Sequence, residues 1–220
     1  APDNASSIII NAGKTTIKNT AEDGIGLSAF SNGYLEVNGD LTVEASKAIN
    51  VRGNSTVLIN KDKTGVVTLN GDIVFDTPNQ KPDGDSYNSG AVLNANVTVN
   101  LTEGSSWTGR AYQGYPVKNT AGKWEENKTV ELKDNRDEYY GFVTNFSVNI
   151  DNGGVWNMTG DSFVNNAAVN EGGVVNVKKD VKTVNAAALD MNGGVINMQG
   201  SAEQQVNVVS LTGTGGTVKA

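Results

Sequence analysis

The stretch Gly153–Val177, "GGVWNMTGDSFVNNAAVNEGGVVNV", contains the same six-residue phrase twice: Gly-Gly-Val, any residue, Asn, and an apolar residue. A third copy, "GGVINM", begins at Gly193, and a shortened fourth, "GGTV", begins at Gly215. The four phrases start 19, 21 and 22 residues apart. A period near 20 residues is too short for a repeat of paired helices and is typical of one coil of a β-solenoid.

Two positions of the phrase are apolar in every full copy. They hold Trp156, Val175 and Ile196 at the first position and Met158, Val177 and Met198 two residues later. Residues two apart lie on the same side of a β-strand, so both positions are predicted to face the interior. Between them lie Asn157, Asn176 and Asn197, which we expect to face outward and to stack as an asparagine ladder between coils.

The alternation of apolar and polar residues continues upstream of the phrase. It appears in "YLEVNGDLTV" (34–43), "STVLIN" (55–60), "NVTVNL" (96–101) and "NFSVNI" (145–150). No window of ten or more residues keeps a helical period, so little helix is expected. Short Gly, Asn and Asp connections leave coiling as the way to bring parallel strands together. The sequence predicts an all-β parallel β-helix with coils of about 20 residues. An antiparallel sandwich, or a chain merely rich in Gly and Asn, is the alternative.

Composition and charge exclude several classes of function. With 17 basic and 24 acidic residues the net charge is −7, so a broad positive surface for nucleic acid is absent and nucleic acid is excluded as the main partner. There is no Cys, which excludes disulfides and thiolate metal sites. No apolar run approaches the roughly 18 residues of a membrane-spanning helix. The first residues, "APDNASS", do not read as a signal peptide, so we expect a mature or excised piece.

The stretch Asn152–Gly160 with Ser162 resembles the repeating phrase of Gram-negative autotransporter passenger domains, the pertactin-like and adhesin-type surface proteins. "EGSSWTGRAY" (103–112) looks like another copy, with its Trp at position 107. The resemblance covers residues from about 30 to 106 and from 141 to the end; it departs at Val175, which replaces the Trp. It implies a right-handed β-helix at the cell surface or outside the cell. It also implies anchoring by a C-terminal outer-membrane barrel that is not among these residues.

The alternation fails between Gly109 and Gly141. We therefore expect a single β-helix fragment over residues 1–220, with N-terminal coils in 1–109, an inserted loop region in 110–140 and C-terminal coils in 141–220. Insertions in solenoids form protruding loops, and loops on rigid scaffolds often carry binding. A second, shorter loop is expected at Asp76–Gly90.

Aromatic and charged residues gather in the inserted region, and large aromatic side chains suit recognition of protein or sugar. The candidate binding residues are Tyr112, Tyr115, Trp124, Arg136, Tyr139 and Tyr140. In the alternative interpretation these aromatics fold back over a coil edge and shield it, with "VELKD" (130–134) as a small extra strand.

The residue types present leave little room for catalysis. There is no His and no Cys, which removes the commonest general base and the Ser-His-Asp relay. The carboxylates of "KDNRDE" (133–138) are the nearest candidates for glycan cleavage, but a solvated charge run explains them better. "DGDSYN" (83–88) lacks the glycine and the closing glutamate of a calcium loop. We expect no catalytic residue, no metal site and no cofactor.

The leading hypothesis is a surface-displayed passenger module that acts as an adhesin or a self-association stalk through its solenoid face and loops. Its expected partner is a host or bacterial surface protein or glycan, or a second copy by lateral contact, and the fragment is not expected to insert in a membrane. A polysaccharide-degrading β-helix enzyme and a purely structural spacer are the alternatives.

Overall fold

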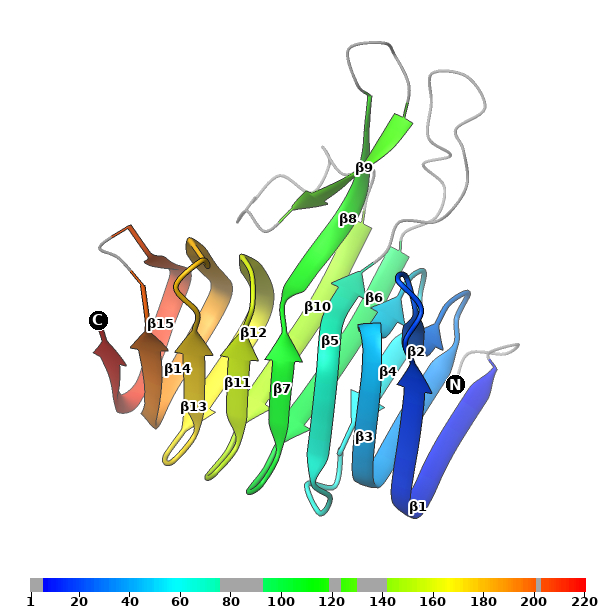
Figure 1. The fold of residues 1–220 in the computed structure, drawn as a ribbon, viewed down its shortest axis with the longest axis horizontal. Helices are drawn as coiled ribbons and strands as arrows, with labels where there is room; N and C mark the ends of the chain where they lie inside the picture. Colours follow the sequence, from blue (N-terminus) through cyan, green and yellow to red (C-terminus); the bar gives the residue numbers. More distant parts are fainter. Residues whose placement is uncertain (1–5, 76–92, 119–123, 130–141, 201–202) are drawn as a thin grey trace.

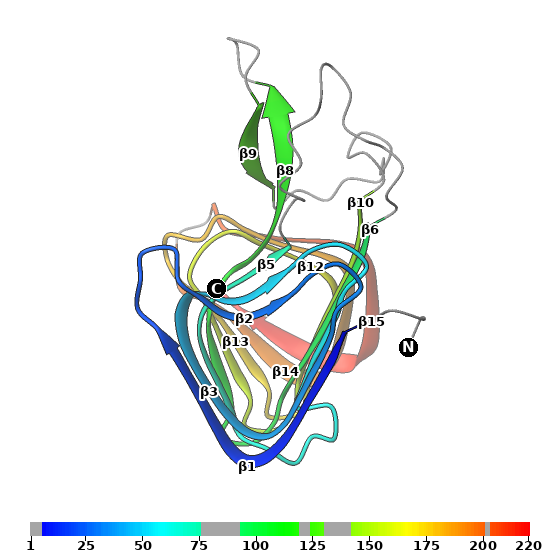
Figure 2. The ribbon, with the colours of Figure 1, turned by 90° about the vertical axis from the view of Figure 1, so that its right-hand side faces the viewer.

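The structure is a computed structural model that describes residues 6–75, 93–118, 124–129, 142–200 and 203–220. These residues form an all-β solenoid of about 7 turns, with coils of about 23 residues. Figure 1 shows the strands side by side along the long axis, and Figure 2 looks along that axis. Seen from the N-terminal end, the chain runs clockwise as it moves away from the viewer (Figure 2), so the solenoid is right-handed. The predicted right-handed parallel β-helix is confirmed.

The described strands differ in length because several of them run around a corner of the solenoid without a break. They are β1 (Ser7–Asn19), β2 (Ile25–Ala29), β3 (Tyr34–Val51), β4 (Thr56–Ile59), β5 (Val67–Phe75), β6 (Leu93–Leu101), β7 (Ser106–Gly109), β8 (Ala111–Lys118), β9 (Trp124–Thr129), β10 (Phe142–Ile150), β11 (Val155–Met158), β12 (Ser162–Asn170), β13 (Val174–Val177), β14 (Thr183–Met198) and β15 (Gln205–Lys219).

The cross-section has three sides (Figure 2), which we call faces 1, 2 and 3 in the order in which the chain passes through them. Face 1 includes β4, β6 and β10. Face 2 includes β7, β11 and β13. Face 3 includes β2 and the last residues of β3 and β5. Every pairing between neighbouring coils is parallel, and strands β3, β14 and β15 contribute to all three faces.

The interior is filled by the apolar residues that the alternation predicts. Strands β4, β7, β11 and β13 alternate between partly buried and buried side chains along their length. The register stacks Trp107 on Trp156, Trp156 on Val175, and Val175 on Ile196. All four are buried, as are the other predicted interior residues apart from Met198, which is partly buried against the core. The coil-by-coil superposition of the phrase is therefore confirmed.

The glycines of the phrase lie at the corner between faces 1 and 2. Gly153 and Gly172 have φ of +74° and +75°, a left-handed conformation that costs little only for glycine. The second glycine of each pair lies against the neighbouring coil: a Cβ on Gly173 would be 2.3 Å from the carbonyl oxygen of Ile150. One glycine makes the turn and the next allows close stacking, so the phrase begins where the chain changes face.

Two parts of the chain depart from the regular coil. The mean coil length exceeds the predicted 20 residues because the earlier coils contain longer connections. In the C-terminal coils, asparagines that hydrogen-bond to each other across neighbouring coils are 19 to 22 residues apart. After Gly109, β8 continues out of the solenoid and pairs antiparallel with β9, forming a projecting hairpin (Figure 1). The loop expected at Asp76–Gly90 and the extra strand expected at "VELKD" lie outside the described residues.

Candidate interaction surface

Face 2 carries the predicted asparagine ladder on its outer side. The Nδ2 atom of Asn176 donates to Oδ1 of Asn157 at 2.9 Å, and Nδ2 of Asn197 donates to Oδ1 of Asn176 at 2.9 Å. All three side chains are half-buried. Since β11, β13 and β14 hold them in register, the amides are spaced by the distance between coils. The expected outward ladder of Asn157, Asn176 and Asn197 is confirmed.

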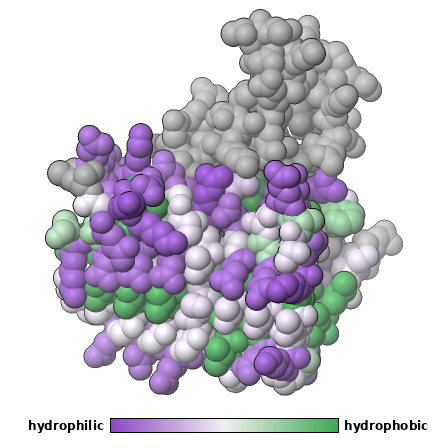
Figure 3. All heavy atoms as spheres, in the orientation of Figure 1, coloured by the Kyte–Doolittle hydropathy of each residue, from purple (hydrophilic) through white to green (hydrophobic). Residues whose placement is uncertain are grey.

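A stripe of valines runs beside this ladder. Val155, Val174 and Val195 occupy equivalent positions in β11, β13 and β14, two residues before the asparagines, and point outward because they have the same parity. All three are half-buried, like the asparagines. Figure 3 shows the result as an apolar band with a polar band above it. We call these six residues, Val155, Val174, Val195, Asn157, Asn176 and Asn197, the Val–Asn face; none of them is charged.

The amide ladders have a common direction. In the following bonds between side-chain amides of neighbouring coils, the later coil donates and the earlier coil accepts. The pairs are Asn38 to Asn11, Asn149 to Asn100, Asn166 to Asn145, Asn176 to Asn157, Asn192 to Asn170, Asn197 to Asn176 and Asn207 to Asn185. Each stacked amide thus repeats the orientation of the one before it, and the amide dipoles add along the solenoid axis.

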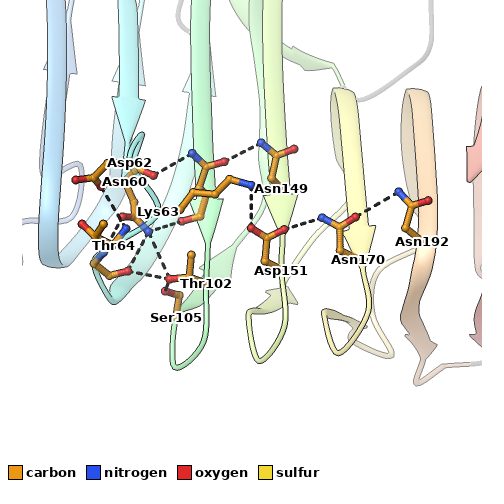
Figure 4. A network of polar contacts seen from close by, with 12 residues as sticks. Asn60, Asp62, Lys63, Thr64, Thr102, Ser105, Asn149, Asp151, Asn170 and Asn192 are labelled. Atoms are coloured by element: carbon orange, nitrogen blue, oxygen red, sulfur yellow. Dashed lines mark hydrogen bonds and ion pairs between the residues drawn. The ribbon is translucent and has the colours of Figure 1, made fainter.

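A second ladder follows the corner between faces 1 and 2 (Figure 4). Asn192 donates to Asn170 at 3.3 Å, and Asn170 donates to Oδ1 of Asp151 at 2.6 Å. An ionised aspartate can only accept hydrogen bonds. Asp151 therefore fits only the first position of such a ladder, where the side chain accepts a bond and donates none. The Nζ atom of Lys63 binds its other oxygen at 2.9 Å and balances its charge.

Lys63 reaches this ladder because a loop replaces the glycine turn in the third coil. Asn60 is fully buried at the base of that loop and has a φ of +54°. Its amide donates to the carbonyl of Gly65 at 2.9 Å and accepts from the Gly65 N–H at 2.9 Å, which closes the loop (Figure 4). Residues 61–64 are exposed outside the corner.

A carboxylate cluster lies on the outer side of face 1 in the second and third coils. Glu36 is only 8% exposed. It accepts hydrogen bonds from the Tyr34 hydroxyl, from Nδ2 of Asn38 at 2.8 Å and from Nζ of Lys61 at 3.1 Å. These bonds, with that from Tyr34 the strongest cause, lower the pKa of Glu36 from 4.5 to about 2. The same pairing raises the pKa of Lys61 and that of Tyr34. A carboxylate held ionised in this way is poorly suited to act as a general acid at neutral pH.

A third polar cluster marks the base of the projecting hairpin. Arg110 stands between β7 and β8, and its Nε atom lies 3.2 Å from Oδ2 of Asp72. Its guanidinium carbon lies 4.5 Å from the centre of the Tyr112 ring, a cation–π arrangement. The backbone N–H of Arg110 also donates to Oδ1 of Asp72 at 3.1 Å. This cluster fixes the point at which the chain leaves the solenoid.

The predicted binding residues fall in three places. Tyr112 is 2% exposed, so its ring packs at the base of the hairpin rather than facing solvent. Tyr115 and Trp124 lie on β8 and β9, opposite Asn127 and Lys118 respectively. Arg136, Tyr139 and Tyr140 lie outside the described residues. Of the six, the structure therefore places three on strands β8 and β9, and the predicted binding role of the set stays a prediction.

Two outward groups on the solenoid were not foreseen, although the sequence contains a signal for both. Alternate residues of a strand point to opposite sides, so a strand that turns Asn157 outward also turns Val155 outward. In the same way, a strand that buries Leu35 and Val37 places three residues together on its outer side: Tyr34, Glu36 and Asn38. The partner of Glu36 could not be inferred, because Lys61 is brought to it only by the register of β3 with β4.

Among the described residues, no group of three or more His, Cys, Asp or Glu side chains is placed to hold a metal ion. In the same part of the chain, no helix is long and apolar enough to cross a membrane.

Comparisons with known proteins do not identify a family for the chain. No family model matches the chain. No curated protein matches it either. Among solved structures, it is similar to the C-terminal domain of a tapirin from Caldicellulosiruptor kristjanssonii, with 13% sequence identity and a TM-score of 0.34. The alignment covers 98% of this chain and 52% of that one, so the chain spans about half the length of the domain that it matches. A TM-score this low carries no further structural or functional conclusion.

Proposed function

We propose that this chain is a passenger module of an autotransporter, displayed at the cell surface, where it acts as an adhesin or a self-association stalk. The module works by contact rather than by catalysis. Its partner is a surface protein or glycan of a host or bacterial cell, or another copy of the module. The solenoid supplies a rigid support, and the Val–Asn face and the hairpin supply the contacts.

The observation that carries the proposal is the Val–Asn face. It combines half-buried valine side chains with amides, repeated at the coil spacing and without charge. Apolar area supplies association energy, and each added amide contact contributes a small increment. A net charge of −7 repels other acidic surfaces, so an uncharged face is where a second acidic surface can approach most closely.

Rigidity supports the same function. Each ladder amide is fixed by a neighbour above or below, and the valines stand on strands whose other side is buried core. A surface that is ordered before binding loses little conformational entropy on contact. Many weak contacts on one rigid rod also act together when two cells meet.

A bead assay with matched variants tests the proposal. Beads coated with the purified chain are scored for clumping and for attachment to bacterial and epithelial cells. The variant Val174→Lys with Asn176→Lys adds two charges to the Val–Asn face. The control, Asn145→Lys with Ser147→Lys, adds two charges on face 1 and likewise removes bonds to a stacked asparagine, Asn166.

We expect the face 2 variant to reduce clumping or attachment severalfold and the face 1 control to leave both unchanged. Equal behaviour of the two variants would remove the Val–Asn face from the proposal. Wild-type beads that neither clump nor attach would favour a spacer. Release of sugars from polysaccharides by the purified chain would favour an enzyme instead.

A further inference from the structure

The Val–Asn face is part of a longer uncharged surface on face 2. Strands β5 and β7 continue its two outward rows, with Thr68 and Ser106 in the row of the valines and Asn70 and Thr108 in the row of the asparagines. The two rows therefore run over five successive coils, and none of their side chains is charged. We call these two rows the face 2 track; Figure 3 shows the side of the molecule that carries it.

Charged residues end the track in the row of the asparagines. The position before Asn70 holds Glu44, and the position after Asn197 holds Lys219. Between them the five coils span about 19 Å, which is four spacings of about 4.8 Å between neighbouring coils. The track therefore suits a ligand that is long, narrow and uncharged.

The row of asparagines keeps hydrogen-bonding groups for such a ligand after the ladder has formed. A side-chain amide has two N–H donors and an oxygen that accepts two bonds. Asn176 uses one N–H on Asn157 and accepts one bond from Asn197, which leaves it one donor and one acceptor site. Thr108 adds a hydroxyl to the same row, and a hydroxyl also donates and accepts. Each coil of the track can thus both donate to a ligand and accept from it.

The row beside it supplies apolar contact. Its three valines are half-buried next to the amides, and Thr68 adds a further methyl group. A pyranose sugar has hydroxyl groups around its edge and C–H groups on its faces, so it matches a surface on which amides lie next to methyl groups. One sugar unit of an extended polysaccharide is also close in length to the coil spacing of about 4.8 Å. Successive sugars would then meet successive coils.

From this match we propose that the face 2 track binds an extended, neutral polysaccharide that lies along the solenoid axis, with about one sugar unit per coil. The inference rests on the proposed adhesive function and names the chemical class of its partner. An acidic glycan is disfavoured, because the chain has a net charge of −7 and repels other acidic molecules. A repeating polymer is favoured over a protein because the track presents the same kinds of group at every coil.

Titration calorimetry of the purified chain with defined oligosaccharides tests the inference. The extended probes are cellohexaose and mannohexaose, which are neutral and β-linked. Maltohexaose is the matched control, since it has the composition of cellohexaose but its α-linked units form a curved chain. We expect at least one extended probe to bind tenfold or more tightly than maltohexaose. Its affinity should rise with the number of sugars until the oligosaccharide spans the five coils of the track.

A pair of matched variants locates the site. Thr108→Lys places a charged side chain across the track but outside the Val–Asn face. We expect it to weaken binding of the hexasaccharide tenfold or more and to change binding of the trisaccharide little, because the three coils of the Val–Asn face still hold three sugars. Thr98→Lys is the control: Thr98 is equally half-buried and points outward on face 1. This variant should leave both affinities unchanged.

The inference is overturned if neither extended probe binds better than maltohexaose, or if Thr108→Lys and Thr98→Lys behave alike. Equally tight binding of hexagalacturonate would also overturn it and would assign the surface to acidic glycans. The bead assay reports separately on the proposed function. Beads that clump or attach although no oligosaccharide binds would remove only this inference. Oligosaccharide binding by a chain whose beads neither clump nor attach would remove only the adhesive function.

Discussion

At the residue scale, asparagine acts in this protein as a directional hydrogen-bonding unit. Its amide has a donor at one atom and an acceptor at the other, so a stacked column can satisfy every member except the two at its ends. In the face 2 ladder, Asn176 both accepts from Asn197 and donates to Asn157. Asn157 accepts from Asn176 at the start of the column. Asp151 shows the same logic in the corner ladder, where it accepts from Asn170.

This asymmetry predicts different costs for the same substitution at two positions. Asn176→Asp removes a donor that is used and places carboxylate oxygen against the Oδ1 of Asn157. Asn157→Asp keeps the acceptor that Asn176 needs. We expect Asn176→Asp to lower the free energy of unfolding by about 1–2 kcal/mol more than Asn157→Asp at pH 7.

The comparison is made by urea denaturation at pH 7 and again at pH 3. A protonated aspartate can donate, so the difference between the two variants should narrow in acid. Equal costs at pH 7 would contradict the directional reading of the ladder.

Glu36 gives a prediction of pH dependence. Its pKa in the folded chain is about 2, lowered from 4.5 by hydrogen bonds from Tyr34, Asn38 and Lys61. A lowered pKa means that the stabilisation is complete above pH 4.5 and is lost as the pH falls toward 2. Glu36→Gln should therefore reduce the urea midpoint at neutral pH, and the deficit should shrink between pH 4.5 and 2.

Glu44→Gln serves as the reference for that titration. Glu44 pairs with Lys18 at 2.7 Å, but both side chains are largely exposed, and exposed ion pairs contribute little. Its effect on the midpoint should be small at every pH. A Glu36→Gln deficit that does not change with pH would show that the charge of Glu36 is not what stabilises the cluster.

At the scale of elements, the core depends on stacking equivalent side chains from adjacent strands. Trp107 of β7 and Trp156 of β11 stack with ring centres 4.3 Å apart and planes within 8°. Each indole N–H donates to a backbone carbonyl, of Gly71 at 2.9 Å and of Gly109 at 3.0 Å. Here the sequence was sufficient for prediction, because "EGSSWTG" (103–109) and "NGGVWNM" (152–158) both place a Trp three residues after a shared Gly.

Trp156→Ala should lower the free energy of unfolding by about 3–5 kcal/mol, since it removes a buried ring and leaves a cavity beside Trp107. Trp156→Phe keeps an aromatic ring and should cost clearly less. Chemical denaturation followed by far-UV circular dichroism measures both. The interpretation fails if the two variants lose the same amount.

The corner glycines allow a second test at this scale. Gly173→Ala places a Cβ 2.3 Å from the carbonyl oxygen of Ile150 in the neighbouring coil, and we expect a loss of about 1–3 kcal/mol from this overpacking. At Gly13 an added Cβ meets nothing within 4 Å, so Gly13→Ala should be close to neutral. Thermal melting of the two variants side by side checks the contrast, and a comparable loss at Gly13 would contradict it.

The hairpin is the element that sequence reasoning did not foresee. The alternation of the solenoid stops at Gly109, which correctly marked an interruption, but "AYQGYPVK" and "WEENKT" have no repeated partner elsewhere in the chain. Their pairing is antiparallel and local, and no turn of the Asn-Gly type joins them to announce a hairpin.

At the scale of the whole molecule, the repeat predicted the architecture because one coil determines the next. A solenoid contacts itself only through neighbouring coils, so a period near 20 residues and an alternation of two were enough to give a parallel β-helix and its interior. The function of a surface depends instead on what differs between coils. One outward position of face 2 holds polar residues in two earlier coils, Thr68 and Ser106, and valine in the next three coils. These valines, Val155, Val174 and Val195, form the apolar part of the Val–Asn face.

Local stability should vary along the rod. Within the described residues, β1 and β15 each pair on one side of the stack only, and Ile8 and Leu211 are 60% and 63% exposed although their positions correspond to core rows. Central strands such as β7 and β11 have a coil on both sides. Amide hydrogen exchange should therefore be fastest in β1 and β15 and slowest in β7 and β11.

Mass spectrometry of peptides from the native chain measures this profile. In Trp156→Ala the protection of β7 and β11 should fall toward that of the ends, because the packing between those coils is lost. Uniform exchange from end to end would mean that the rod opens as a single unit.

The common direction of the amide ladders also determines how such a rod can change in length. A duplicated unit of 19 to 22 residues, the spacing of the bonded ladder asparagines, would receive a hydrogen bond from the following unit and donate one to the preceding unit. No two donors and no two acceptors would meet at either junction. Each duplication in the gene would lengthen the rod by about 4.8 Å and would need no compensating substitution in its neighbours.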